Sequence, residues 1–142
     1  MADNHESNID LAERAIDLWL RSKKEILQYL TEDCVYEITP GGTEDVVPHH
    51  GIYKGPKGVA DFFNTNDDSV ETERCSRPPR SQYVAVGDKV VVTGSSTFRI
   101  VSSGVRYESY WVLIWTIRDG KIAGLKMLFD EDAARDAWKK SK

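Results

Sequence analysis

Two adjacent histidines are the side chains of this sequence best suited to moving a proton. His49 and His50 stand directly before Gly51, in a stretch that reads as an irregular loop. An imidazole titrates near neutral pH and is the commonest general acid and base in proteins. We predict a catalytic role for His50, or for His49 if that ring is the one that turns inward. A surface or hydrogen-bonded loop histidine is the alternative for both.

Tyr36 is the candidate for holding a substrate oxygen. The sequence around it alternates and is rich in β-prone residues, so Tyr36 and Ile38 are expected to point inward and Glu37 outward. An inward phenol could donate a hydrogen bond to a carbonyl or a developing enolate. A buried tyrosine bonded to a backbone group is the alternative, and Tyr53 and Tyr107 are weaker candidates of the same kind.

Large apolar and aromatic residues recur at spacings that would bring them together inside the fold. Their convergence predicts an apolar, aromatic-walled cavity that binds substrate, although such residues also form ordinary cores. The predicted substrate-binding residues are Trp19, Ile38, Tyr53, Phe63, Tyr107, Trp111, Leu113, Trp115, Leu125 and Met127.

The sequence offers no pattern for a metal or a phosphate-bearing cofactor. No His, Asp or Glu grouping has metal-ligand spacing, and no glycine-rich phosphate loop follows a strand. Any chemistry is therefore expected to be cofactor-free, with no metal. Cys34 and Cys75 lie far apart, outside any Cys-x-x-Cys motif, and are expected to be free thiols.

Charge and hydropathy limit the classes of partner. The 142 residues carry a formal charge of -4 with scattered basic residues, which argues against nucleic acid. No segment approaches the ~20 apolar residues that span a bilayer, and the first residues lack a signal-peptide pattern. We expect a cytoplasmic protein that binds neither membranes nor nucleic acid.

Helical patterns dominate the first half of the chain. Apolar residues recur every three or four positions over residues 7–21 and again over 23–30, and a short helix is expected around 59–63. Between the second and third helices lie a strand at 34–39 and a loop with a mobile acidic middle at Glu44 and Asp45. Residues 1–7 are expected to be a flexible N-terminus.

The second half alternates with period two. Strands are predicted at 70–77, 81–86, 89–93, 105–117 and 121–129, with a hairpin turn at Asp119-Gly120. A last helix follows at 131–139, and Asp130 before it is expected to cap it rather than to catalyse. Helices followed by consecutive antiparallel strands indicate one α+β domain over residues 1–142.

The strand at 105–117 has two unequal faces. Aromatic and apolar residues from Tyr107 to Ile117 alternate on one face, which should line the interior. The other face includes Tyr110, Val112 and Ile114 and is too apolar to be fully solvated. Partial cover by a second subunit would explain this, so a homodimer is expected.

Three segments of the sequence carry a family resemblance: Leu30-Thr-Glu-Asp-Cys-Val-Tyr-Glu, Val47-Pro-His-His-Gly-Ile-Tyr-Lys-Gly-Pro-Lys-Gly-Val-Ala-Asp-Phe-Phe, and Tyr110-Trp-Val-Leu-Ile-Trp-Thr-Ile-Arg-Asp-Gly-Lys-Ile-Ala with Phe129-Asp130 after it. All three resemble the SnoaL-like proteins, relatives of ketosteroid isomerase and nuclear transport factor 2. They occur in the family's order and cover most of the chain. The resemblance implies a cone: a curved antiparallel sheet wrapped by N-terminal helices around a pocket, with a short C-terminal helix.

The residues that catalyse in this family are not carried over here. The isomerases of the family have a carboxylate base at the position where this sequence has Ile38. Its cyclases have a histidine and an aspartate at the positions where this sequence has Leu113 and Met127. The arginine and aspartate of the limonene-epoxide-hydrolase-like members have no clear counterpart around Ser95 to Thr97. Since fold alone does not give function, those specific activities are in doubt.

Three functions are consistent with these patterns. The first is an isomerase, cyclase, dehydratase or hydrolase acting on a hydrophobic polyketide-, terpenoid- or steroid-like molecule, as in secondary metabolism. The second is a protein that binds such a molecule without altering it. The third is a structural dimerisation module whose indole rings fill the interior.

Overall fold

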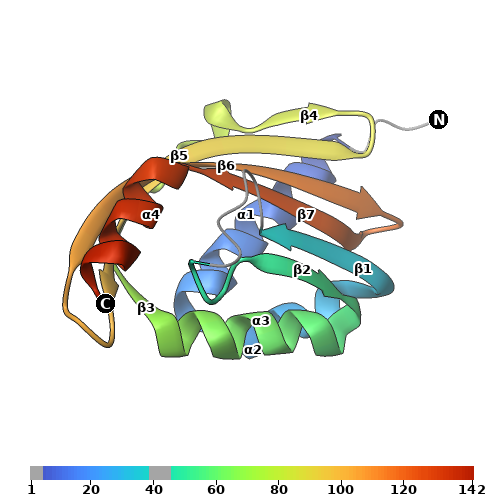
Figure 1. Cartoon of the computed structure of the whole chain (residues 1–142). Coiled ribbons are helices and arrows are strands. Elements are labelled where there is room, and N and C mark those ends of the chain that lie inside the picture. Colours follow the sequence, from blue (N-terminus) through green and yellow to red (C-terminus); the bar gives the residue numbers. More distant parts are fainter. Residues whose placement is uncertain (1–4, 39–45) are drawn as a thin grey trace.

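A computed structural model describes residues 5–38 and 46–142, in which a curved sheet is covered by helices (Figure 1). The helices are α1 (His5–Arg21), α2 (Lys23–Ile26), α3 (Gly55–Ser69) and α4 (Glu131–Lys140), with 3-10 turns η1 (Leu27–Tyr29) and η3 (Arg80–Gln82). The strands are β1 (Leu30–Ile38), β2 (Gly51–Lys54), β3 (Val70–Cys75), β4 (Val84–Val86), β5 (Lys89–Ile100), β6 (Arg106–Arg118) and β7 (Lys121–Phe129). The predicted α+β cone is confirmed.

The sheet is mixed. Its order is β2-β1-β7-β6-β5-β3, and β4 pairs with β5. All neighbours pair antiparallel except β1 and β7, which are parallel, with Tyr36 opposite Leu125. The expectation of a purely antiparallel sheet is therefore corrected at this pair. A hairpin joins antiparallel strands, whereas β1 and β7 are joined by most of the chain and are free to run in the same direction.

Several boundaries differ from the sequence-based expectations. α1 begins at His5, so residues 5–7 are helical and not a flexible end. β1 begins at Leu30, where the second helix was expected to end. α3 extends beyond the expected 59–63 at both ends. It begins at Gly55, with Pro56 in its first turn, and continues to Ser69. Thr39, Glu44 and Asp45 lie outside the described residues.

Two further local features concern the strands of the second half. The expected strand at 81–86 is divided into η3 and β4, and β5 continues to Ile100. The predicted hairpin turn is confirmed, because Asp119 and Gly120 both have positive φ, 52° and 75°. This pair of values is what a two-residue turn with the twist of β6 and β7 requires.

The capping role expected of Asp130 is confirmed. Its side chain accepts a hydrogen bond of 3.1 Å from the backbone N–H of Ala133, in the first turn of α4. Lys139 and Lys140 occupy the last turn, where positive charge complements the helix dipole. Figure 1 shows α4 at the end of the curved sheet beside β6. This helix closes one end of the fold over a small second core with Trp138, Val70 and Ile100.

The main core lies between the inner face of the sheet and helices α1 and α3. Alternate residues of β6 are buried there as predicted: Ser109, Trp111, Leu113, Trp115 and Ile117. The opposite face is more exposed, and Tyr110 has 56% of its surface accessible. Cys34 and Cys75 are free thiols. None of the helices in the described residues is long and apolar enough to cross a membrane.

Candidate functional site

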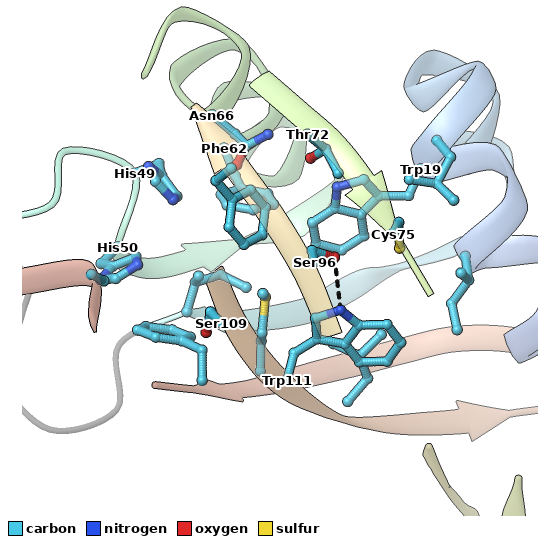
Figure 2. A pocket seen from close by; sticks show the side chains of 18 of the residues that line it. Trp19, His49, His50, Phe62, Asn66, Thr72, Cys75, Ser96, Ser109 and Trp111 are labelled. Carbon is cyan, nitrogen blue, oxygen red and sulfur yellow. Dashed lines mark hydrogen bonds between the residues drawn. The ribbon is translucent and has the colours of Figure 1, made fainter. Parts of the chain in front are cut away.

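A pocket lies between α1, α3 and the inner face of the sheet (Figure 2). The residues lining it are Ile16, Trp19, Leu20, Ile38, His49, His50, Phe62, Asn66, Thr72, Cys75, Ser96, Phe98, Tyr107, Ser109, Trp111, Leu113, Met127, Phe129 and Ala134. Its cavity volume is about 70 Å³. One water needs about 10–15 Å³, so the pocket has room for several waters.

Trp111 forms the floor of the pocket and is fixed by two neighbours on β5. Its indole N–H donates a hydrogen bond of 2.9 Å to the Oγ of Ser96, and both residues are buried. Its ring lies against Gly94, its partner across the two strands, where an added Cβ would overlap the indole. Glycine is therefore needed at position 94 for the close approach of this ring. These two contacts hold the floor of the pocket in place without a ligand.

Aromatic side chains from the helices form the opposite wall. Trp19 of α1 packs edge-on against Phe62 and Phe63 of α3, with ring centroids 5.5 Å and 5.3 Å apart. Phe62 lines the pocket, whereas Phe63 packs in the core behind it. Edge-to-face contacts of this kind hold aromatic rings in defined orientations. The two helices thus position Trp19 and Phe62 by contact with each other.

His49 and His50 lie together at one end of the pocket, away from Trp19 (Figure 2). Their rings are 4.8 Å apart, and the ring of His50 lies 4.2 Å from that of Phe129. Both residues are buried, with 6% and 7% of their surfaces exposed. Tyr53 supports the turn by donating a hydrogen bond of 2.9 Å to the backbone oxygen of His49.

Burial keeps both imidazoles neutral. Loss of hydration lowers the pKa of His49 from 6.5 to about 4. Burial also lowers the pKa of His50 to about 2, with a further contribution from His49 beside it. The Nδ1 atom of His49 is buried and has no hydrogen-bond partner within the described residues. That nitrogen remains available to a ligand in the pocket.

Tyr36 is buried in the core and does not line the pocket. Its ring lies among Phe62, Phe63 and Trp115, and its hydroxyl has no partner among the described residues. Burial raises the pKa of this phenol far above its usual value of 10. Ile38, two residues later on the same face, does reach the pocket. Tyr36 and Ile38 therefore share the inward face of β1 but have different surroundings, the aromatic core and the pocket.

The remaining predicted binding residues divide into two groups. Trp19, Ile38, Tyr107, Trp111, Leu113 and Met127 line the pocket. Tyr53, Phe63, Trp115 and Leu125 do not, and pack in or against the core around it. Burial raises the pKa of Tyr107 to about 12, so its phenol stays neutral.

Sequence reasoning missed most of the polar part of the lining. Asn66, Thr72, Cys75 and Ser96 all contribute to the pocket, beside Ser109, which was expected on the inward face of β6. Helical spacing could have indicated Asn66, because it stands four residues after Phe62 and therefore on the same face of α3. The other three lie on β3 and β5, whose pairing partners could not be read from the sequence.

The described lining of the pocket carries no charged side chain. No Asp, Glu, Lys or Arg is among the residues that line it. Within residues 5–38 and 46–142, no cluster of three or more His, Cys, Asp and Glu side chains could hold a metal ion. An apolar wall with a few neutral polar groups fits an uncharged organic ligand, because an unpaired charge would be desolvated there without compensation.

Residues 12–125 match the SnoaL-like domain family. The chain belongs to this family. Among solved structures, an NTF2-like protein from Burkholderia xenovorans LB400 is 26% identical over 94% of this chain and 96% of its own, with a TM-score of 0.80. No curated protein matches.

Two more distant neighbours share the SnoaL-like fold. An LEH-like epoxide hydrolase from M. tuberculosis is 16% identical, covers 98% of this chain and 94% of its own, and has a TM-score of 0.70. A proposed polyketide cyclase from Xanthomonas campestris pv. campestris is 15% identical over 96% and 99%, with a TM-score of 0.75. At these identities the likeness concerns the fold alone.

In this SnoaL-like chain, the three positions at which the family resemblance implies catalytic groups carry apolar side chains. Ile38, Leu113 and Met127 all line the pocket. Their side chains can contact a ligand but cannot exchange a proton with it. In the described lining, His49 and His50 carry imidazoles, the side-chain type most often used for general acid–base catalysis, and burial keeps both neutral.

Proposed function

We propose that this protein binds a small, uncharged, largely hydrophobic molecule in the pocket and rearranges it by proton transfer at His49 and His50. The observation that carries the proposal is the composition of the lining: aromatic and aliphatic walls, no charged side chain in the described residues, and two buried imidazoles at one end. The reaction would be an isomerisation, cyclisation, dehydration or hydrolysis of a polyketide-, terpenoid- or steroid-like substrate. The fold shared with an epoxide hydrolase and a proposed polyketide cyclase supports this range.

The geometry suits catalysis by positioning. The indole of Trp111 is fixed by Ser96 and Gly94, and Trp19 is fixed by the two phenylalanines of α3. A ligand held between such walls has lost much of its freedom before it reacts, which can lower a barrier by several kcal/mol. Proton transfer by His49 at its unpaired Nδ1 would then require no charged partner.

Binding without conversion is the second candidate function. The pKa values of about 4 and 2 make the two imidazoles weak bases, and no carboxylate in the described lining assists them. A protein that stores or delivers a hydrophobic molecule would need only the walls. The presence of a pocket argues against the third possibility, a purely structural module with a filled interior.

Turnover by purified variants distinguishes these functions. Native mass spectrometry identifies a co-purifying molecule, and a panel of hydrophobic ketones, epoxides and lactones is then incubated with the protein and analysed by chromatography and mass spectrometry. We expect product from the wild type, with a large loss in His49→Gln and His50→Gln. His5→Gln is the matched control, because His5 lies on α1 outside the pocket lining. Ligand that binds and is recovered unchanged would instead establish the binding function.

We also propose that two copies associate through the outer face of the sheet. Val84 pairs with Val91, Val91 pairs with Ile114, and Tyr110 is exposed, so an apolar strip crosses β4, β5 and β6. Exposed apolar strips of this kind are typical of interfaces. Light scattering coupled to gel filtration should give a dimer, and Tyr110→Glu should shift it towards monomer. A wild-type monomer at micromolar concentration contradicts this proposal.

A further inference from the structure

We propose that Asn66 recognises a carbonyl oxygen of the ligand and holds the polar end of the molecule at the mouth of the pocket. This inference rests on the proposed function, because it specifies the ligand of the same pocket. It assigns a role to a side chain that the proton-transfer proposal does not use.

The side chain of Asn66 lines the pocket and makes no hydrogen bond within the described residues. The residue is 9% exposed and lines the pocket from α3, beside Phe62 (Figure 2). Its backbone oxygen accepts the N–H of Val70 at the end of the helix. Within the described residues, however, no group hydrogen-bonds its side-chain amide. Its amide atoms are not among the buried polar atoms left unsatisfied, so they face accessible space, where a ligand oxygen can accept a hydrogen bond from the N–H₂.

Ser96 adds a second donor to the same pocket. Its Oγ accepts the hydrogen bond from Trp111, which leaves the hydroxyl proton of Ser96 to be donated elsewhere. The amide N–H₂ of Asn66 and this hydroxyl both favour an acceptor on the ligand. A carboxylate would lack a cation in the described lining, so a neutral carbonyl of a ketone, ester or lactone fits best.

Asn66 also stands where the pocket meets the surface. A surface cleft of about 410 Å³ lies outside the pocket, and the two share Trp19, Leu20, Asn66 and Thr72. Thr72, which lines both, is exposed.

Charged pairs border this cleft. The ammonium of Lys23 lies 2.8 Å from the carboxylate of Asp67, and Arg99 pairs with Glu71. A ligand that enters from the cleft would place its apolar body against Phe62 and the floor. Its oxygen would remain near Asn66, on the side of the charged pairs that border the cleft.

A pair of isosteric probes tests the role of the oxygen. Acetophenone and α-methylstyrene have nearly the same shape, but the second has a methylene group in place of the carbonyl oxygen. Titrations followed by protein NMR give a Kd for each probe with the wild type, Asn66→Leu and Asn64→Leu. Asn64 lies on the same helix but is exposed and outside the pocket lining, so its variant is the matched control.

We expect the ratio of the acetophenone Kd to the α-methylstyrene Kd to rise about threefold to tenfold in Asn66→Leu, the size of one hydrogen bond. The ratio should be unchanged in Asn64→Leu, and acetophenone should shift the Asn66 side-chain N–H₂ resonances of the wild type. Equal ratios in wild type and Asn66→Leu, with both probes binding, overturn the role of Asn66 and leave the proposed function standing. If neither probe binds the wild type, the pocket itself is not a ligand site and both proposals fail.

Discussion

The indole N–H of Trp111 donates a hydrogen bond to Ser96, a residue on the neighbouring strand fifteen positions earlier in the chain. Both partners are buried, so loss of either would leave a desolvated polar group. The bond fixes the orientation of one of the two indole rings in the described pocket lining. It shows how the sheet itself, and not a loop, determines the shape of the site.

The close packing of Trp111 on Gly94 predicts a severe effect of one methyl group. In Gly94→Ala the added Cβ would overlap the indole and approach the Oγ of Ser76 to 2.7 Å. We expect a loss of about 1–3 kcal/mol in the free energy of unfolding, typical of overpacking, with a shifted tryptophan emission. Urea denaturation measures the change. Ser95→Ala, at an exposed neighbouring position, is the control and should be nearly neutral.

The positions of the four tryptophans predict which of them report on ligand. Trp19 and Trp111 line the pocket, whereas Trp115 and Trp138 do not. A bound quencher should therefore lose most of its effect on fluorescence in Trp19→Phe and Trp111→Phe. Titration of each single variant with the same ketone provides the measurement. Strong quenching that disappears only in Trp138→Phe would place the ligand elsewhere.

Burial of the two histidines predicts lower stability in mild acid. Their pKa values are about 4 and 2 in the folded chain, below the ordinary value of 6.5 expected after unfolding. The unfolded chain therefore binds more protons as the pH falls below about 6.5. The free energy of unfolding should be nearly constant above pH 7. Below it, stability should fall by up to about 1.4 kcal/mol per pH unit for each histidine.

Urea denaturation between pH 7 and pH 5 measures this slope without strong interference from carboxylates. The pKa values of Asp17, Asp33 and Glu73 are lowered by hydrogen bonds to Arg21, Thr31 and Arg106 respectively, so these groups act at more acid pH. His49→Gln and His50→Gln should each reduce the slope, and His5→Gln should leave it intact. A slope that survives in the double variant of His49 and His50 would contradict the assignment.

The unpaired hydroxyl of Tyr36 predicts that the fold tolerates its removal. Removing a buried hydroxyl that has no partner also removes its desolvation cost, so Tyr36→Phe should be neutral or slightly stabilising. Thermal unfolding would test this. Because Tyr36 lies outside the pocket lining, turnover of a substrate should also persist in this variant. A loss of turnover with unchanged stability would return Tyr36 to the catalytic role that the sequence favoured.

Local periodicity was enough to predict the inner face of β6 and the core face of α1. Each signal involves residues a few positions apart, and the structure confirms both. The alternation around Tyr36 and Ile38 was also read correctly as one inward face. It could not show that only Ile38 reaches the pocket, because that depends on the curvature of the sheet and on the phenylalanines of α3 that cover Tyr36.

The polar lining was harder to predict for a different reason. Ser96 and Cys75 are brought together by the pairing of β3 with β5, whose register shifts at a bulge. A shift of this kind changes which side chains face inward beyond it. No pattern within either strand contains that information, whereas the helical interval from Phe62 to Asn66 does and could have been used.

The parallel pairing of β1 with β7 has a consequence for the order of events during synthesis. β1 emerges from the ribosome early, but its partner is complete only when Phe129 has been added. Until then β1 has only the four residues of β2 beside it, and the inner face of the sheet has no continuous surface. Contacts between segments so distant in sequence form slowly and leave apolar strands exposed in the meantime. We therefore expect β1 to stay exposed to aggregation until translation has passed Phe129.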